Sequence, residues 1–252
     1  MPTSPFIFSK KSLSLLTAFT SLFLFLVWSF YQLDYQWNWP SIYEYRYKFF
    51  YGWLTTIGIS FVALLLSTII GLLTALALIY PSELLKAYAR VYIEIIRGTP
   101  FLVQLLISFY VVGSAIGLEN RYIVGVLCMS LFSGAYMAEI IRSGITAIEK
   151  GQLDSARAIG LTKMQTYQLV IFPQSMRIIL PSIAGQFVSL IKDSSLLSVL
   201  AISEFTLNAQ EVNSFTYSTM ESYLPLGLGY LLLTLPLSLA IQNFEKRWRY
   251  ET

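Results

Sequence analysis

Long apolar stretches recur along the chain and are separated by shorter polar segments. Six such stretches occupy residues 13–31, 53–80, 98–118, 122–138, 178–203 and 222–244. Five of them contain no charged residue, and the fifth in order is interrupted once, by Lys192-Asp193. Because about 20 apolar residues suffice to cross a bilayer as a helix, the pattern predicts an all-α integral membrane protein with about six transmembrane helices.

The first stretch has a second interpretation, because Lys10-Lys11 precede it as in a secretory signal peptide. The residues that close it include Trp28, Phe30 and Tyr31, which are too bulky for a small-residue cleavage site. We therefore expect a retained membrane anchor.

Composition agrees with a lipid environment, since 56% of the 252 residues are hydrophobic and 12% are charged. A typical soluble domain has about 25% charged residues. The chain has no histidine and one cysteine, Cys128, which excludes disulfides within the chain and imidazole-based catalysis. Cys128 lies in an apolar stretch and is expected to be a packing residue. The net charge of +3 is modest, and no nucleic-acid partner is expected.

The positions of lysine and arginine predict the orientation, because positively charged loops stay in the cytoplasm. With the N-terminus inside, thirteen basic residues fall in inner segments: Lys10, Lys11, Lys86, Arg90, Arg97, Arg142, Lys150, Arg157, Lys163, Arg177, Lys246, Arg247 and Arg249. The outer segments hold three, Arg46, Lys48 and Arg121, while the outer stretch 204–221 has three glutamates and no cation. Both termini are therefore expected in the cytoplasm.

The inner connection at 142–177 is longer than the other connections. Residues 152–159 suit a short helix, with Asp154 expected near its start and Arg157 near its end. Gly160 forms a turn, and Thr162 with Gln165 fits a capping box for a second helix, which should stop before Pro173. Either the two helices lie on the lipid headgroups, or they form a docking surface for a cytoplasmic partner.

Residues 154–160, 171–174 and Leu180-Pro181 resemble the "EAA" loop of ABC importer permeases. Asp154 and Ser155 depart conservatively from that motif, and Ala156 and Gly160 match it. Four further segments resemble the polar amino acid branch of the family: 97–104, 134–142, 148–152 and 186–195. The resemblance runs from about Gly52 to the C-terminus.

The resemblance implies a five-helix permease domain at 52–252 with a helical cytoplasmic coupling loop at about 142–180. Residues 1–51 would add an N-terminal cytoplasmic tail, an extra anchor span and an outer loop. The helix at 152–160 would be the coupling helix, seated in a groove of a cytoplasmic ABC ATPase. Its expected coupling residues are Gln152, Asp154, Ser155, Ala156, Arg157 and Gly160. A role for Gly160 as a helix cap alone stays open.

The sequence supports a separate ATPase independently of the resemblance, because it contains no G-x-x-x-x-G-K-[ST] loop to hold ATP phosphates. No cofactor is expected in this chain, and ATP would bind to the partner. The family implies three other partners: a second permease subunit (the same chain or a related one), an extracytoplasmic amino-acid-binding protein and a polar amino acid substrate. The expected location is the bacterial inner membrane, among its lipids.

Lys192-Asp193 is the candidate substrate site, because charged residues within a span are costly and functional by default. Counting about 1.5 Å per residue from Pro181 places Lys192 roughly 16 Å into the span, near mid-depth. The pair could bind the carboxylate and ammonium of an amino acid, helped by Ser194, Ser195, Gln186 and Ser189. The alternative is a structural Lys–Asp pair that neutralises itself.

Two further charge pairs, Glu94/Arg97 and Glu139/Arg142, have the i, i+3 spacing of helical ion pairs. Other classes of protein explain the chain less well. An ion-driven secondary transporter would commonly show an internal repeat of its spans, and none is found. An intramembrane aspartyl enzyme needs two membrane carboxylates, and Asp193 is the only aspartate in a span. The specific amino acid stays open.

Overall fold

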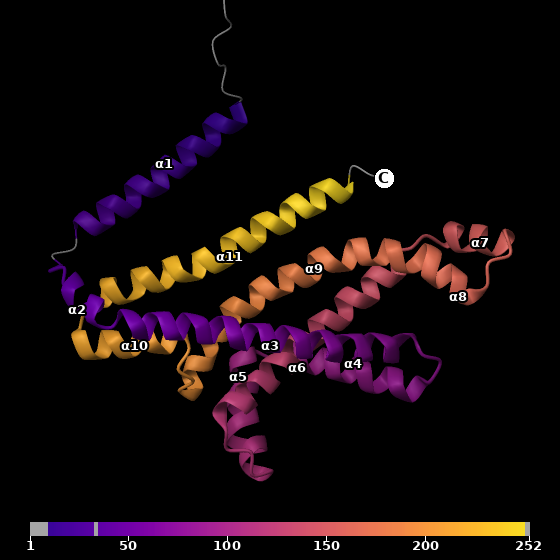
Figure 1. The fold of residues 1–252 in the computed structure, drawn as a ribbon, viewed down its shortest axis with the longest axis horizontal. Coiled ribbons are helices and arrows are strands. Elements are labelled where there is room, and N and C mark those ends of the chain that lie inside the picture. The colour runs from indigo at the N-terminus through magenta and orange to yellow at the C-terminus, as the bar shows by residue number, and fades with distance from the viewer. Residues whose placement is uncertain (1–9, 33–34, 250–252) are drawn as a thin grey trace, which may run out of the picture. The chain divides into compact units, whose positions relative to one another are not determined.

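The computed structural model describes residues 10–32 and 35–249, which form helices connected by short turns (Figure 1). The predicted cytoplasmic tail at 1–9 lies outside the described residues. The helices in order are α1 (Lys10–Tyr31), α2 (Trp39–Glu44), α3 (Arg46–Ile79), α4 (Glu83–Gly98), α5 (Phe101–Ile107), η1 (Ser108–Gly113), α6 (Arg121–Thr146), α7 (Lys150–Ala158), α8 (Lys163–Thr166), η2 (Tyr167–Ile171), α9 (Phe172–Asp193), η3 (Ser194–Leu200), α10 (Phe205–Thr216) and α11 (Thr219–Arg249).

The chain forms two compact units, Met1–Asn38 and Trp39–Thr252. The first contains α1, in which Leu16–Tyr31 is apolar but shorter than the roughly 20 residues that a span needs. The second begins with α2. Ile42 of α2 is buried with Phe49 and Phe205, so α2 packs with the helices of the second unit.

Four helical segments are long and apolar enough to cross a membrane: Arg46–Ile79, Arg121–Thr146, Lys163–Leu200 and Thr219–Lys246. The span expected at 98–118 is not a straight helix. Glu83–Gly98 and Phe101–Gly113 together pass the same test but are bent by 109°, which makes a broken span or a re-entrant loop. Pro100 lies at the bend and caps α5, because its missing N–H suits the start of a helix.

The segment after α7 also differs from the sequence prediction, because the helix that begins at Lys163 does not stop before Pro173. It continues through the π-helical turn η2 into α9. The amide of Phe172 bonds the carbonyl of Tyr167, five residues back, so the turn is one residue wider than an α-helical turn. Pro173 follows at once and lacks an N–H, so the widened turn accommodates the proline that would otherwise break the helix.

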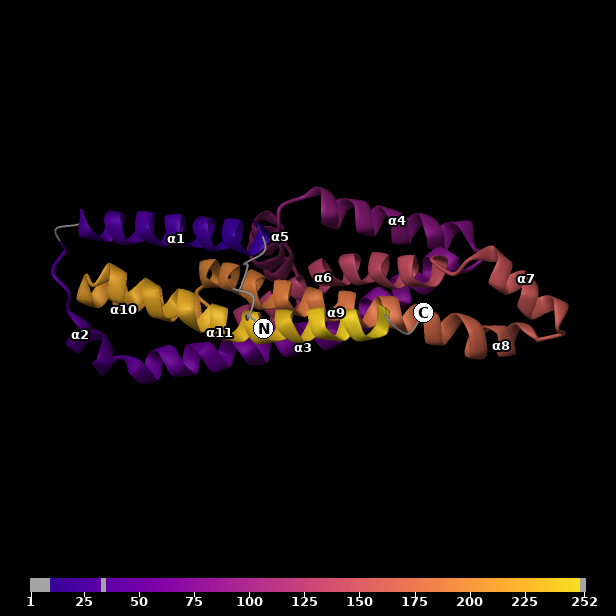
Figure 2. The same ribbon diagram turned by 90° about the horizontal axis from the view of Figure 1, so that it is seen from above.

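Helices α3 and α6 pack closely because small residues face each other along their contact. Ala63 and Ala75 of α3 and Ala135 and Ala138 of α6 are fully buried. Helix association in membranes relies on such small residues, which let backbones approach. Helix α9 packs on α6 and α11, and the two views agree on this order (Figures 1 and 2).

Gly71 provides a test of the α3–α6 contact, since a Cβ at this position would overlap Met137 Cβ and lie 3.0 Å from the backbone nitrogen of Ala138. We expect Gly71→Ala to destabilise the purified protein by about 1–3 kcal/mol through overpacking. Gly58→Ala in the same helix is the control, because a Cβ there meets no atom within 4 Å. Thermal unfolding in detergent measures both, and equal melting temperatures would contradict the close contact.

Candidate functional site

Helix α7 lies at the end of the protein where α6 finishes and α8 begins, at the tip of the long connection (Figure 1). It starts at Lys150, earlier than the sequence suggested, so Asp154 sits mid-helix rather than in the first turn. Asp154 instead pairs with Arg157 on the same helix, at 3.3 Å between Oδ1 and NH1. Both side chains are exposed, so the pair contributes little stability and stays accessible.

The turn after α7 requires glycine, because Gly160 has a φ of +81°. The amide of Leu161 donates to the carbonyl of Ala156, and the amide of Gly160 donates to that of Arg157. These bonds close a Schellman-type C-terminus, which satisfies carbonyls that the helix leaves unpaired. Thr162 and Gln165 then form the predicted capping box at the start of α8, which confirms that part of the loop prediction.

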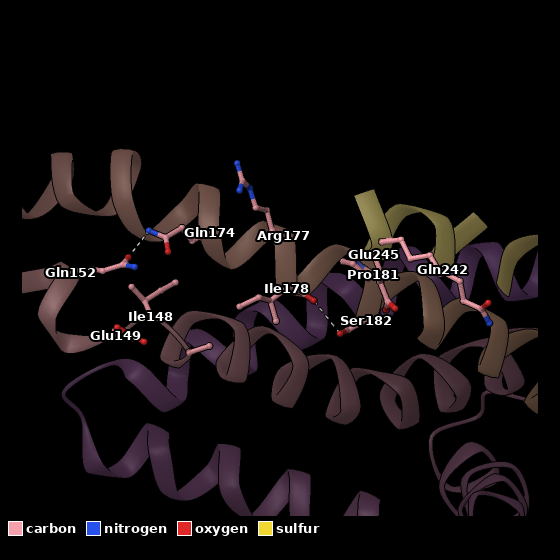
Figure 3. A pocket seen from close by; sticks show the side chains of 12 residues that line it. Ile148, Glu149, Gln152, Gln174, Arg177, Ile178, Pro181, Ser182, Gln242 and Glu245 are labelled. Atoms are coloured by element: carbon pink, nitrogen blue, oxygen red, sulfur yellow. Dashed lines mark hydrogen bonds between the residues drawn. The ribbon is translucent and has the colours of Figure 1, made fainter. Parts of the chain in front are cut away.

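The six residues expected to contact an ATPase do not share one environment. Ala156 is 3% exposed and faces the rest of the chain, whereas Ser155 and Asp154 face outward. Gln152 joins α7 to α9, because its Oε1 accepts a hydrogen bond of 2.7 Å from Gln174 Nε2 (Figure 3). Ala156 therefore packs α7 against the rest of the protein, and Asp154 and Ser155 lie on the exposed face of the helix, which we call its free face.

The free face of the loop also has an apolar part. Ile159 is 77% exposed at the end of α7, and Met164 and Leu169 are also exposed nearby. Large apolar side chains gathered at a loop tip mark an interaction surface.

Arg97, Glu139 and Arg142 form a charge cluster between the last turn of α4 and the C-terminal part of α6. Arg142 donates two hydrogen bonds to Glu139, of 3.0 and 3.3 Å, which confirms the predicted i, i+3 pair. The pair expected between Glu94 and Arg97 does not form. Arg97 NH1 instead lies 3.7 Å from Glu139 Oε2, because α4 packs against α6 and brings the two side chains together.

Lys192 and Asp193 close α9, and the chain continues from Ser194 as the 3₁₀ helix η3. The two residues form no ion pair with each other, since adjacent helical residues point in different directions. Lys192 is exposed, and no described residue gives it an ion-pair partner. The change of helix type places both charges where the span is interrupted.

The four polar residues grouped with this pair have separate partners. Gln186 Nε2 donates to Ser133 Oγ of α6 at 3.2 Å, which ties α9 to α6. Ser194 and Ser195 donate to the carbonyls of Ile191 and Lys192, at 2.8 and 2.7 Å. Ser189 donates to Gly185 O at 3.4 Å. Ser189 and Lys192 are exposed, whereas Ser194 is buried.

Glu204 is a buried carboxylate that the sequence prediction missed. It is fully buried and caps α10 by accepting from the amides of Thr206 and Leu207, at 2.9 and 2.7 Å. The hydroxyls of Tyr230 and Thr56 donate to it from α11 and α3, at 3.1 and 3.4 Å. One carboxylate thus joins three helices at the end opposite α7. The stretch of glutamates without cations was the signal that could have indicated it.

Removing the Glu204 carboxylate should destabilise this end of the protein. We expect Glu204→Ala to lower the free energy of unfolding by about 2 kcal/mol or more, because it deletes a cap and leaves buried donors unpaired. Glu211→Ala is the control, since it removes an ion pair with Lys48 that is partly exposed. If thermal unfolding moves equally in both variants, the buried network does not hold the three helices.

The described part of the chain contains no group of three or more acidic, cysteine or histidine residues that could hold a metal ion. Its charged and polar residues gather instead at the α7 end, at the close of α9 and around Glu204. The first two positions have exposed polar groups that suit the binding of a partner or a polar solute, whereas Glu204 is buried.

Residues 67–250 match the family of binding-protein-dependent transport system inner membrane components. A putative glutamine transport system permease protein GlnP from Rickettsia conorii is 33% identical over 214 residues, which cover 82% of this chain and 98% of the relative. The glutamine transport system permease protein GlnP of Escherichia coli is 31% identical over 216 residues, covering 85% and 99%.

Two solved structures are similar as well. A chain of an amino acid ABC transporter crystallised with histidines has a TM-score of 0.79 and 34% identity, covering 84% of this chain and 100% of that one. A chain of the MetNI methionine ABC transporter has a TM-score of 0.67 at 15% identity, covering 80% and 96%, and shares the fold.

Proposed function

Because the chain belongs to the family of binding-protein-dependent transport system inner membrane components, we propose that it forms the translocation pathway of an importer for a polar amino acid. Relatives from two bacterial groups carry glutamine transport in their names, and the most similar of the structures above was crystallised with histidines. Both amino acids are zwitterions with a polar side chain. The bacterial inner membrane is the corresponding location.

The observation that carries the proposal is the form of α7. It is a short helix with an exposed polar and apolar face, held from behind by Ala156 and ended by a glycine in a left-handed conformation. A helix so presented can enter a groove of another protein. We propose that this groove belongs to an ABC ATPase, which supplies the ATP-binding site that the chain lacks.

The proposed orientation puts α7 in the cytoplasm. Arg90 and Arg97 of α4, Arg142 of α6, Lys163 of α8 and Arg177 of α9 would then lie toward the inner side, in keeping with the positive charge expected there. The opposite end, with α10 and Glu204, then meets a soluble amino-acid-binding protein. A second permease subunit would complete the pathway.

Lys192 and Asp193 are proposed to contact the substrate. They lie where α9 gives way to η3, within a segment of Lys163–Leu200 long enough to span the membrane. Lys192 has no ion-pair partner among the described residues, so it remains available to a carboxylate. Ser189 is exposed one helical turn from Asp193, on the same face.

Substitution of Gly160 tests the coupling role of α7. We expect Gly160→Ala, and more strongly Gly160→Val, to lower uptake while ATP hydrolysis continues, because a side chain at φ +81° costs about 1 kcal/mol or more and distorts the turn. The measurement is the ratio of amino acid taken up to ATP hydrolysed in proteoliposomes that contain the complete importer.

Gly151→Ala is the matched control, since Gly151 is helical and a Cβ there meets no atom within 4 Å. Normal coupling in both Gly160 variants would count against the docking role. Uptake by the chain in vesicles that contain no ATPase would contradict the importer proposal as a whole.

Substitution of Asp193 tests the substrate site. If its carboxylate binds the ammonium group, Asp193→Asn should raise the KM for uptake at least tenfold, the loss of about 1.4 kcal/mol or more of charge-assisted bonding. Glu83→Gln, an exposed carboxylate in the first turn of α4, is the control and should leave KM unchanged. An unchanged KM in Asp193→Asn would assign the residue a structural role.

A further inference from the structure

An open cleft lies beside α7, between the loop that follows α6 and the helices α9 and α11. Its volume is about 900 Å³, within the range of roughly 300–1,000 Å³ that small-molecule sites occupy. Gln152 and Gln174 stand at one end of it, and Gln242 and Glu245 of α11 at the other (Figure 3). Arg177 lies between them along α9. No residue of the candidate substrate site lines this cleft.

Equal numbers of acidic and basic residues line the cleft. Glu149 and Glu245 are acidic, Arg177 and Lys246 are basic, and no other charged residue lines it. None of the four forms an ion pair with any described residue. Elsewhere at this end, opposite charges do pair, as Glu139 does with Arg142. Both signs of charge are thus present in one cleft and remain open to a ligand.

The remaining lining is suited to a compact polar molecule. Ile148, Ile178 and Pro181 provide apolar surface, while the amides of Gln152, Gln174 and Gln242 can both donate and accept hydrogen bonds. An anion such as phosphate would meet two carboxylates, and a cation would meet Arg177 and Lys246. A zwitterion satisfies both signs at once.

We propose that this cleft is a second binding site, for a free zwitterionic amino acid with a polar side chain, reached from the cytoplasm. The choice of an amino acid, and of the cytoplasmic side, rests on the proposed function. The Arg177 guanidinium binds the carboxylate, since its fork matches that group bidentately. A glutamate of the cleft binds the ammonium, and the glutamine amides bind the polar side chain.

The cleft is separate from Lys192-Asp193. Arg177 and Lys192 are fifteen residues apart on one continuous helix, which at about 1.5 Å per residue is roughly 22 Å. One amino acid cannot touch both places. Each site can therefore be disabled without removing the ligand contacts of the other.

A ligand bound in the cleft would restrict the movement of α7 relative to α9. Gln152 belongs to α7 and Gln174 to the long helix that ends at Asp193, and their hydrogen bond forms part of the cleft wall. A ligand that bonds both amides fastens α7 to α9. A high internal concentration of the amino acid should therefore slow uptake, because α7 then moves less freely with its partner.

The test measures binding of radiolabelled L-glutamine, L-histidine and L-arginine to the complete permease–ATPase complex without its binding protein, in nanodiscs of phosphatidylglycerol. This lipid carries no ammonium group, so no zwitterionic headgroup competes. Asp193→Asn removes the proposed pathway contact, and we expect binding of at least one of these amino acids to survive it. Adding Arg177→Gln should weaken the remaining binding at least tenfold.

Lys163→Gln is the matched control, because Lys163 is an exposed cation near α7 that does not line the cleft. It should bind as the Asp193→Asn parent does. A second variant, Glu149→Gln with Glu245→Gln, should weaken binding as Arg177→Gln does, which a single misfolded variant would not explain.

Two results would overturn the inference. One is equal binding in the Arg177 and Lys163 variants, and the other is no binding of any of the three amino acids once Asp193 is replaced. If wild-type complex with binding protein still performs ATP-driven uptake in either case, the proposed function stands. If such uptake is absent but binding depends on Arg177, the proposed function fails alone.

Discussion

The close approach of α3 and α6 is the constraint on which the rest of the second unit depends. Lipid tails are as apolar as the helices, so the hydrophobic effect cannot hold two spans together, and packing has to do so. Buried alanines and Gly71 let the two backbones meet. Helix α6 then serves as the support for α9, through Ser133 and Gln186 and through Gly144, where a Cβ would overlap Ile179.

The two ends of the helix bundle, at α10 and at α7, are stabilised by different interactions. At the α10 end, the buried carboxylate of Glu204 binds groups from three helices, and such a network has little freedom to rearrange. At the other end, α7 is seated by Ala156 and joined to α9 by an exposed hydrogen bond. One end is therefore rigid, and the other can respond to a partner or a ligand.

Helix α9 runs between the α7 end and the α10 end. It runs without a break from the loop through Pro173 and ends at Asp193, where the backbone tightens into η3. A seven-residue 3₁₀ segment is long for that geometry, whose hydrogen bonds are poorer than those of an α-helix. It ends at Ala201, whose φ of 55° is uncommon for alanine. The charged pair thus lies at a junction of two helix types.

Much of this protein was determined by its sequence alone. Apolar stretches that match the bilayer thickness indicate spans, and the Thr162 capping box and Gly160 turn are local features that neighbouring residues decide. The 109° bend between α4 and α5 and the π-helical passage through Pro173 were visible only in the structure. The choice of Glu139 as the partner of Arg97 depended on packing between helices. So did the burial of Glu204 and the cleft beside α7. The Arg97–Glu139 pair, the buried Glu204 and the cleft each join residues that are distant in sequence. No local pattern predicts these contacts, because only folding brings the residues together.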